Sequence, residues 1–467
     1  MKSFQSSRAK YHYGVLFFCF LLSLGNKDGL CSESIKLEYL GKIQEPAWAW
    51  GSEARIYINN DKLFIPLGYP GLAIYDISNP QTPQLLKILD NTELGGQAGA
   101  VAVQGNYAYV ATPDKGTIIK VDISNPSGAT VAEQFGEIPN ILQLAIRGQF
   151  LYAHAQSSIA YAGGVYVFDI SKDKTVSAGQ YLKNLIDPGF FVTSTGGVFL
   201  ARTPEYSGDS AKIDYIDMSQ PASPNHLGQW LSSYPGNICD IYLRGNRLYC
   251  ASYWGGVWIL DASDFSNLKL EALFDWDDPA SYSKSIQTFP PYIFVAEGGP
   301  ILAYQKFEVF RQIDNRIILE QEIPASTYTD SVYLYKDLLI RVEIESPWQV
   351  SWPNKILYFY RIDIGLKPPI NVYLQRTINR SLFREEAFHT LRWTANPDNS
   401  AYQIKEYRIY RKYLENDDQS YQLIGTVPGN IYEYVDGYLD VSKKFMYAIA
   451  SLESEGLESL YSVPAGN

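Results

Sequence analysis

The stretch Tyr75–Asp90, YDISNPQTPQLLKILD, ends an apolar run with Asp-Ile-Ser-Asn-Pro. Asp76 and Asn79 can hydrogen-bond to the backbone of the turn that they begin, and Pro80 fixes φ and stops the strand. We therefore interpret the motif as a device that reverses one strand into the next, with Ile77 buried between neighbouring units. Such Asp residues could instead bind metal ions, but no second carboxylate follows at the spacing of metal ligands.

The motif recurs along the chain at nearly constant spacing. Its five copies are DISNP, DISNP, DISKD, DMSQP and DASDF, which start at Asp76, Asp122, Asp169, Asp217 and Asp261. A degenerate copy without the Asp starts at Ile301, and the series ends at Asp363. The distance from Asp261 to Asp363 is 102 residues, which is about two repeats. The chain therefore contains seven units.

Each unit has the same internal pattern, which the second unit shows best. AVAVQGNYAYVAT contains two alternating strands around Gly105-Asn106, GTIIKVDISNP a third strand, and ATVAEQFG a fourth. Four short strands in a unit of forty-odd residues are typical of a β-propeller blade, whose faces are buried by its neighbours. The segment Ser34–Glu45 reads as the fourth strand that the last unit lacks. We expect an all-β fold, a seven-bladed β-propeller closed by this N-terminal strand.

The repeated motif, preceded by Tyr-Val-Ala, resembles a bacterial family of repeats named LVIVP, which occurs in exported and cell-surface proteins. The resemblance covers about residues 35–365, is good in units one, two and five, and weakens in units six and seven. It implies a propeller and no catalytic residues. We assign residues 32–366 to the propeller, and the N-terminal pattern described below assigns residues 1–31 to a signal peptide.

Residues 367–467 differ in character and are predicted to form a β-sandwich. The strand-like segments TLRWTA around Trp393, KEYRIYRKY and FMYAIASLESEGLES follow one another in the order of B, C, F and G strands. This order resembles a fibronectin type III domain, in which Tyr447 would occupy the place of the tyrosine corner. Such domains act mostly as spacers or binding modules.

The N-terminus and the charge limit where the protein acts. Basic residues precede the apolar segment Gly14–Leu24, as in an export signal, and this segment is short for a membrane span. Lipidation of Cys31 is an alternative that the neighbouring Asp28 and Leu30 disfavour. We expect an exported protein in the periplasm, at the cell surface or outside the cell. The net charge of −11 argues against nucleic-acid binding.

Two cysteines remain after the leader. Cys239 and Cys250 flank IYLRGNRLY, which reads as a hairpin with a type II′ turn at Gly245-Asn246. The two lie on one face but diagonally, so a disulfide needs adjusted geometry. Export favours oxidation, and two small core residues are the alternative.

No motif for catalysis or phosphate binding stands out, and His154, His226 and His389 fall in different units. In a propeller, the loops joining strands two to three and four to one lie on one face. These loops are rich in aromatic and acidic residues, which gives a candidate ligand-binding face: Trp48, Trp50, Tyr206, Tyr253, Trp254, Trp276, Asp277, Trp348 and Trp352. Exposed aromatic side chains suit sugar rings or protein contacts, although several Trp could instead pack between blades. Asp277 and Asp278 could bind Ca²⁺, but a calcium site needs six or more oxygens. We expect no other cofactor.

Three functions remain open. A secreted interaction protein would bind an extracellular protein or glycan through this face. A glycan hydrolase or lyase would use carboxylates such as Glu205, Asp277 or Glu345 on the same face, and needs two acids about 5 to 10 Å apart beside an aromatic residue. A structural component of the cell envelope would bind no small molecule. The fold alone cannot decide among them.

Overall fold

The structure is a computed structural model that describes most of the chain between residues 35 and 466. The described residues are 35–47, 55–138, 140–156, 163–183, 186–202, 210–253, 255–274, 282–289, 291–298, 305–313, 316–325, 327–345, 353–380, 385–413, 421–454, 457–462 and 464–466.

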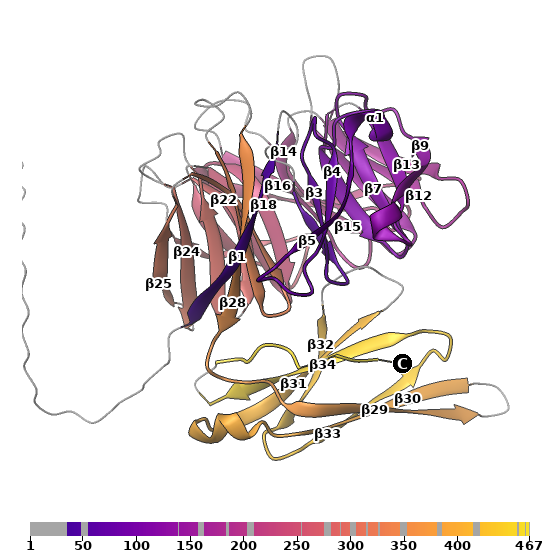
Figure 1. The fold of residues 1–467 in the computed structure, drawn as a ribbon. Helices are drawn as coiled ribbons and strands as arrows, with labels where there is room; N and C mark the ends of the chain where they lie inside the picture. The colour runs from indigo at the N-terminus through magenta and orange to yellow at the C-terminus, as the bar shows by residue number, and fades with distance from the viewer. Residues whose placement is uncertain are drawn as a thin grey trace, which may run out of the picture. The chain divides into compact units, whose positions relative to one another are not determined.

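The described residues up to Asp363 form four-stranded antiparallel sheets, in most of which the strands pair in chain order (Figure 1). The sheets in chain order are β2 (Tyr57–Asn59), β3 (Lys62–Pro66), β4 (Leu72–Asp76) and β5 (Gln84–Leu89); β6 (Ala100–Gln104), β7 (Tyr107–Thr112), β8 (Thr117–Asp122) and β9 (Thr130–Phe135); β10 (Ile141–Arg147), β11 (Phe150–Ala155), β12 (Gly163–Asp169) and β13 (Val176–Lys183); β14 (Ile186–Val192), β15 (Gly197–Arg202), β16 (Ser210–Asp217) and β17 (Asn225–Pro235); β18 (Asn237–Arg244), β19 (Arg247–Tyr253), β20 (Gly256–Asp261) and β21 (Lys269–Phe274); β22 (Ser283–Phe289), β23 (Tyr292–Glu297), β24 (Lys306–Ile313) and β25 (Arg316–Pro324); and β26 (Tyr328–Tyr335), β27 (Leu338–Ile344) and β28 (Asn354–Asp363), which β1 (Lys36–Pro46) completes. A single helical turn, α1 (Asn91–Leu94), follows β5.

The sheets form a closed ring. A separate apolar cluster lies between each sheet and the next, such as the one that Ile74 of β4 and Val110 of β7 share. The same holds for the last sheet and the first, where Phe359 of β28 and Ile43 of β1 pack against Leu63 of β3. The first strands of neighbouring sheets contact one another, so these strands line the channel of the ring. This is the arrangement of a β-propeller, as predicted.

The N-terminal strand closes the last sheet, as the sequence predicted. β1 pairs antiparallel with β28 from Lys36 opposite Asp363 to Pro46 opposite Asn354, with one bulge between Tyr39 and Gly41. Without β1, the backbone donors and acceptors on one edge of β28 would lose their partners.

The repeated Asp forms the predicted turn after the third strand. Its carboxylate accepts the backbone N–H of the residue two positions on at 2.8 to 3.0 Å in each described copy: Asp76, Asp122, Asp169, Asp217, Asp261 and Asp363. The hydrogen bonds from Ser78 hold the pKa of Asp76 at about 2. The next residue is buried, and in the first unit its N–H binds the carbonyl of Asp61 in the turn between the first two strands. The motif therefore ties two turns of one sheet together.

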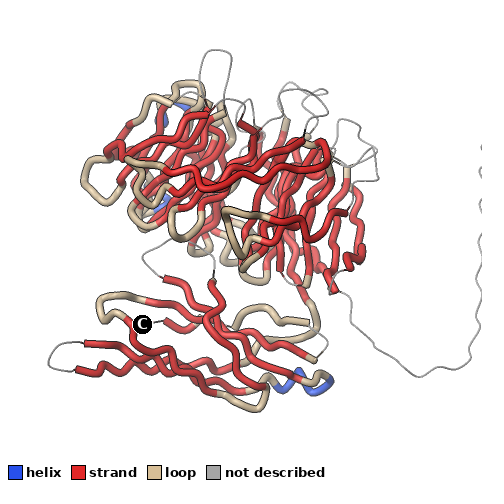
Figure 2. The backbone as a smooth tube through the Cα atoms, turned by 180° about the vertical axis from the view of Figure 1, so that it is seen from behind, coloured by secondary structure: helices blue, strands red, loops and turns tan. Residues whose placement is uncertain are grey.

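The chain beyond Gly365 forms two further sheets (Figure 2). One contains β29 (Ile370–Arg380), β30 (Glu385–Thr394) and β33 (Glu433–Leu439), and the other β32 (Gln422–Pro428), β31 (Ile404–Tyr413), β34 (Phe445–Glu453) and β35 (Ala465–Gly466). Trp393 of β30, Ile409 of β31 and Ile449 of β34 belong to one core, and β30, β31 and β34 are strands where the sequence predicted them.

Among the described residues, the hydroxyl of Tyr447 bonds to side chains and not to the backbone position expected of a tyrosine corner. It donates to Asp436 at 2.7 Å and lies 2.8 Å from Nδ1 of His389. Both partners belong to the opposite sheet, because His389 lies in β30 and Asp436 in β33. Tyr447 therefore joins the two sheets through side chains.

Ser34–Asn467 is one compact unit, and residues near the C-terminus contact the ring. Arg244 at the end of β18 donates to the hydroxyl of Tyr461 at 3.1 Å and to the carbonyl of Thr288 at 2.6 Å. The ring of Tyr461 also packs edge-on against Phe289. Across the described ranges, no helix has both the length and the apolarity to cross a membrane.

Closure of the ring by β1 is tested by deleting most of this strand and by single substitutions within it. Deletion of residues 35–44 should lower the thermal midpoint strongly, because β28 loses its partner. Ile43→Ala should cost about 2 to 4 kcal/mol of unfolding free energy, since Ile43 is buried between the first and last sheets. The matched variant Lys42→Ala, on the exposed face of the same strand, should cost less than about 0.5 kcal/mol. Equal effects of the two point variants in denaturant unfolding would rule out closure.

The Asp turn is tested at Asp122, whose carboxylate accepts from Ser124. Asp122→Ala should lower the thermal midpoint by about 1 to 2 °C, a small change because the chain is long. Asp122→Asn keeps an acceptor and should stay close to the wild type. A loss with Asn as large as that with Ala would show that charge, and not the turn hydrogen bond, matters here.

Candidate functional site

The two loop types predicted to share a face do lie at one end of the ring. Because consecutive strands are antiparallel, the connections from second to third strands and from fourth strands to the next sheet meet where the first strands begin. We call this end the loop end. Of the nine residues predicted for the ligand-binding face, Tyr253 is described. The other eight lie outside the described residues: Trp48, Trp50, Tyr206, Trp254, Trp276, Asp277, Trp348 and Trp352. Glu205 and Asp278 also lie outside them.

An arginine that precedes the first sheet reaches a carboxylate of the fifth sheet near the loop end. Nη2 of Arg55 lies 2.7 Å from Oδ1 of Asp240 and donates to the carbonyl of Cys239 at 3.3 Å. Burial lowers the pKa of Arg55, but the charge and hydrogen bond of Asp240, together with Tyr333 and Asp330, outweigh burial, so the net shift of the pKa is upward and Arg55 stays charged. The other oxygen of Asp240 accepts from the hydroxyl of Ser285 and the N–H of Ile286. Both oxygens of the buried Asp240 carboxylate therefore have hydrogen-bond donors.

A second buried ion pair follows in the next two sheets. Lys284 of β22 lies 3.2 Å from Asp330 of β26, and both side chains are less than a tenth exposed. The other oxygen of Asp330 accepts from the hydroxyl of Ser331 at 3.1 Å. Lys284 also lies over the ring of Tyr328, 4.2 Å from its centre. Removal of one partner of such a pair leaves a buried charge without compensation, at a cost of about 3 to 5 kcal/mol.

Tyr253 belongs to a group of tyrosines beside this pair. Its hydroxyl lies 3.2 Å from that of Tyr328, and its ring packs edge-on against Tyr282 at 5.7 Å. Burial raises the pKa of Tyr253, so it remains a neutral phenol that can donate or accept. Tyr253 is therefore part of the wall of the loop end and not an isolated exposed platform.

Register shifts at the start of the first strands place these polar groups. The pairing of first and second strands shifts between Ile238 and Asp240, between Ser283 and Ser285, and between Thr329 and Ser331. A bulge adds one residue to a strand and can re-aim side chains. Lys284 and Asp330 are the residues inside two of these shifts. Polar residues in otherwise apolar strand beginnings, as in ICDIYL and TDSVYLY, were the sequence signal for this site.

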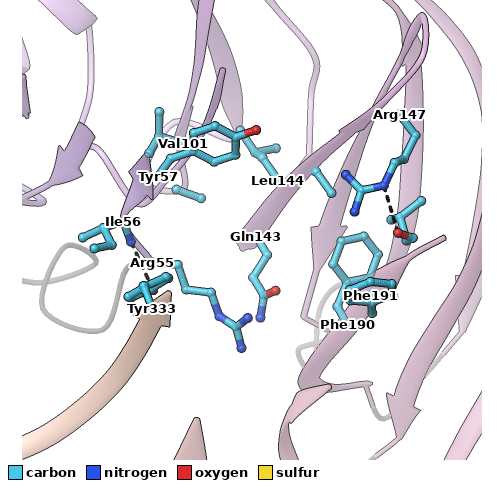
Figure 3. A pocket seen from close by; sticks show the side chains of 13 residues that line it. Arg55, Ile56, Tyr57, Val101, Gln143, Leu144, Arg147, Phe190, Phe191 and Tyr333 are labelled. Carbon is cyan, nitrogen blue, oxygen red and sulfur yellow. Dashed lines mark hydrogen bonds between the residues drawn. The ribbon is translucent and has the colours of Figure 1, made fainter. Parts of the chain in front are cut away.

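A cavity of about 170 Å³ lies among the first strands of the first four sheets and β26 (Figure 3). Its lining is mostly apolar and aromatic, with two guanidinium groups and one amide: Arg55, Ile56, Tyr57, Ala100, Val101, Gln143, Leu144, Ala145, Arg147, Phe190, Phe191, Val192 and Tyr333. No carboxylate belongs to this lining within the part of the chain that the structure describes. Sequence analysis missed the cavity because it joins residues up to 278 positions apart.

His154 lies fully buried beside the cavity. Its ring stacks on Phe190 with the centres 4.9 Å apart, and neither ring nitrogen has a hydrogen-bond partner among the described residues. Burial, with a smaller contribution from the charge of Arg55, lowers the pKa of His154 to about 3. His154 is therefore neutral at physiological pH.

The remaining candidates have structural surroundings. Cys239 and Cys250 are buried thiols that form no disulfide, as in the core alternative, and burial raises the pKa of Cys250. Glu345 accepts from the backbone and side chain of Asn354, which holds the beginning of β28. Among the described residues, no group of three or more His, Cys, Asp or Glu side chains could hold a metal ion.

The LVIVD repeat, a β-propeller-type repeat, matches residues 55–91, 95–135 and 235–275. These are units one, two and five, in which the sequence resemblance was found to be good. The matching repeat is LVIVD and not LVIVP. No curated protein matches the chain.

Several solved structures are similar at low identity. The WD40 β-propeller domain of Doa1 is 10% identical, with 70% of this chain and 96% of that chain covered and a TM-score of 0.48. BamB from Moraxella catarrhalis is 12% identical, with 70% and 98% covered and a TM-score of 0.45. YCF48 bound to D1 peptide is 12% identical, with 71% and 100% covered and a TM-score of 0.49. Similarities at this level carry no conclusion about function.

The burial of His154 predicts a loss of stability in mild acid. A histidine whose pKa falls on folding stabilises the fold fully above its ordinary pKa of about 6.5, and this contribution decreases as the pH falls towards 3. The loss should reach up to about 1.4 kcal/mol per pH unit. His154→Phe keeps the stacking on Phe190 and should flatten the dependence between pH 6.5 and 4.5. Parallel unfolding curves of the two proteins across this range would contradict the buried neutral state.

Proposed function

We propose that this chain is a secreted or cell-surface interaction protein. It would consist of a seven-bladed β-propeller, closed by β1, that binds an extracellular protein or glycan at the loop end. Residues 1–31 would be a leader, and residues 367–467 a fibronectin type III-like β-sandwich that acts as a spacer or second binding module. No nucleic acid would be bound.

The observation that carries the proposal is the contrast between the two ends of the ring. Two ion pairs, the partly buried Arg55 with Asp240 and the buried Lys284 with Asp330, lie near the loop end together with Tyr253. The other end carries short hairpin turns and the repeated Asp turns. Loops on a rigid scaffold commonly bind ligands, because they can vary without disturbing the core. The buried ion pairs would hold the base of such a site in place.

The geometry favours binding of a ligand over cleavage of a glycan by a hydrolase or lyase mechanism. Asp240 and Asp330 are each held by a cation and by hydroxyl or amide donors, so their oxygens are engaged in contacts within the ring. Glu345 holds a strand end. The described residues thus contain no pair of acids beside an aromatic residue in the cavity, which is the arrangement that glycosidases need.

The proposal is tested by a screen of purified surface proteins and cell-envelope glycans, followed by titration of the binders. Trp254→Ala and Trp352→Ala, in loop-end connections, should each weaken binding by roughly thirtyfold if the residue is a contact hot spot. Circular dichroism should show that both variants remain folded.

The matched control is Asn79→Ala at the opposite end, where the side chain accepts from the N–H of Gln81. This change should lower stability slightly and leave affinity unchanged. Wild-type affinity in both Trp variants would refute binding at the loop end, and unfolding of both would show that these residues belong to the core.

A further inference from the structure

Arg55 has donors left over for a ligand. A guanidinium carries five N–H donors, and both hydrogen bonds of Arg55 among the described residues come from Nη2. Its side chain is 31% exposed although the residue lies within the ring. Because Arg55 lines the cavity, Nε and Nη1 remain for a group inside it. Asp240 holds the guanidinium in place, so a ligand would not have to order a flexible side chain.

Two further polar groups share the cavity with Arg55. Figure 3 shows the side chains of Arg55 and Gln143 extending in the same direction. Arg147 is fixed on another side, where Nε donates to the carbonyl of Val192 at 3.0 Å and Nη1 to that of Ile146 at 2.7 Å. No described carboxylate lines the cavity, and Asp240 compensates the charge of Arg55 from outside the lining at 2.7 Å, so the lining offers N–H donors to an anion.

We propose that this cavity binds the carboxylate of an amphiphilic organic acid. The carboxylate would lie against Arg55, and the apolar part would lie against Phe190 and Phe191. This inference rests on the proposed binding function and names the chemical group recognised in the channel.

The cavity selects a carboxylate over a more highly charged anion. A planar carboxylate matches the fork of one guanidinium, whereas a phosphate dianion needs more donors than this largely apolar lining offers. A volume of about 170 Å³ is smaller than the sites of drug-sized ligands. It accommodates an acid of about ten non-hydrogen atoms, or the acidic side chain of a bound protein, which presents the same group.

The test uses 4-fluorobenzoate as the probe and fluorine NMR as the readout, with the full chain. The wild type should bind it saturably at millimolar concentration or tighter. Arg55→Lys keeps a charge beside Asp240 but loses the fork, and should weaken binding about tenfold. Ala145→Leu fills the cavity without changing any charge and should weaken binding at least as much. The control Arg247→Lys alters an arginine–carboxylate pair on the exposed surface, 2.7 Å from Glu271, and should bind as wild type does.

Two competitors identify the recognised group and its source. Excess benzoate should displace the probe, and a short peptide rich in Glu should displace it only if a protein side chain can enter the cavity. Inorganic phosphate at the same concentration should not displace it.

The proposal is overturned if the wild type shows no saturable binding up to about 10 mM, if neutral 4-fluorobenzamide binds equally well, or if both folded cavity variants bind like the wild type. Any of these results would leave binding at the loop-end Trp residues intact, since the Trp variants test that site independently.

Discussion

The structure depends on the pairing of β1 with β28. The last sheet of the ring has only three strands of its own, and β1, at the N-terminal end of the described chain, supplies the fourth. This pairing brings the first and last sheets together around Ile43, Leu63 and Phe359. It also determines where the chain enters the first sheet, because Arg55 lies between β1 and β2. The position of Arg55 in the channel is therefore a consequence of closure.

The channel shows how the fold can hold charges inside. Ionised groups removed from water need a partner of opposite charge and hydrogen bonds for their remaining atoms. Asp240 obtains both from Arg55, which precedes the first sheet, and from Ser285 of β22. The pair thus couples the first sheet to the fifth and sixth across the channel. A site built on these rigid strands is preorganised, which lowers the entropic cost of binding.

The sequence predicted the architecture well because the controlling signals are local. The Asp of each turn and the apolar residue after it lie within a few positions of their partners, and the spacing of these motifs revealed the sheets. The strand that closes the ring could be predicted because the last unit lacked a fourth strand and the strand-like segment Ser34–Glu45 belonged to no unit. The site could not be predicted in this way. Arg55 and Asp240 are 185 positions apart in the sequence. The bulges at Lys284 and Asp330 interrupt the alternation of buried and exposed residues, so this alternation does not predict where the two side chains point. The connections that carry most of the predicted ligand-binding residues lie outside the described structure, so those residues remain predictions.

Closure by β1 is tested most directly by residue-resolved hydrogen exchange of the intact protein. The amides of β28 alternate between partners in β27 and in β1. If β1 completes the ring, both sets of amides should exchange equally slowly. If the β28 amides directed at β1 exchanged as fast as the outward-facing amides of an edge strand such as β21, the ring would be open at this point, and the position assigned to Arg55 in the channel would lose its basis.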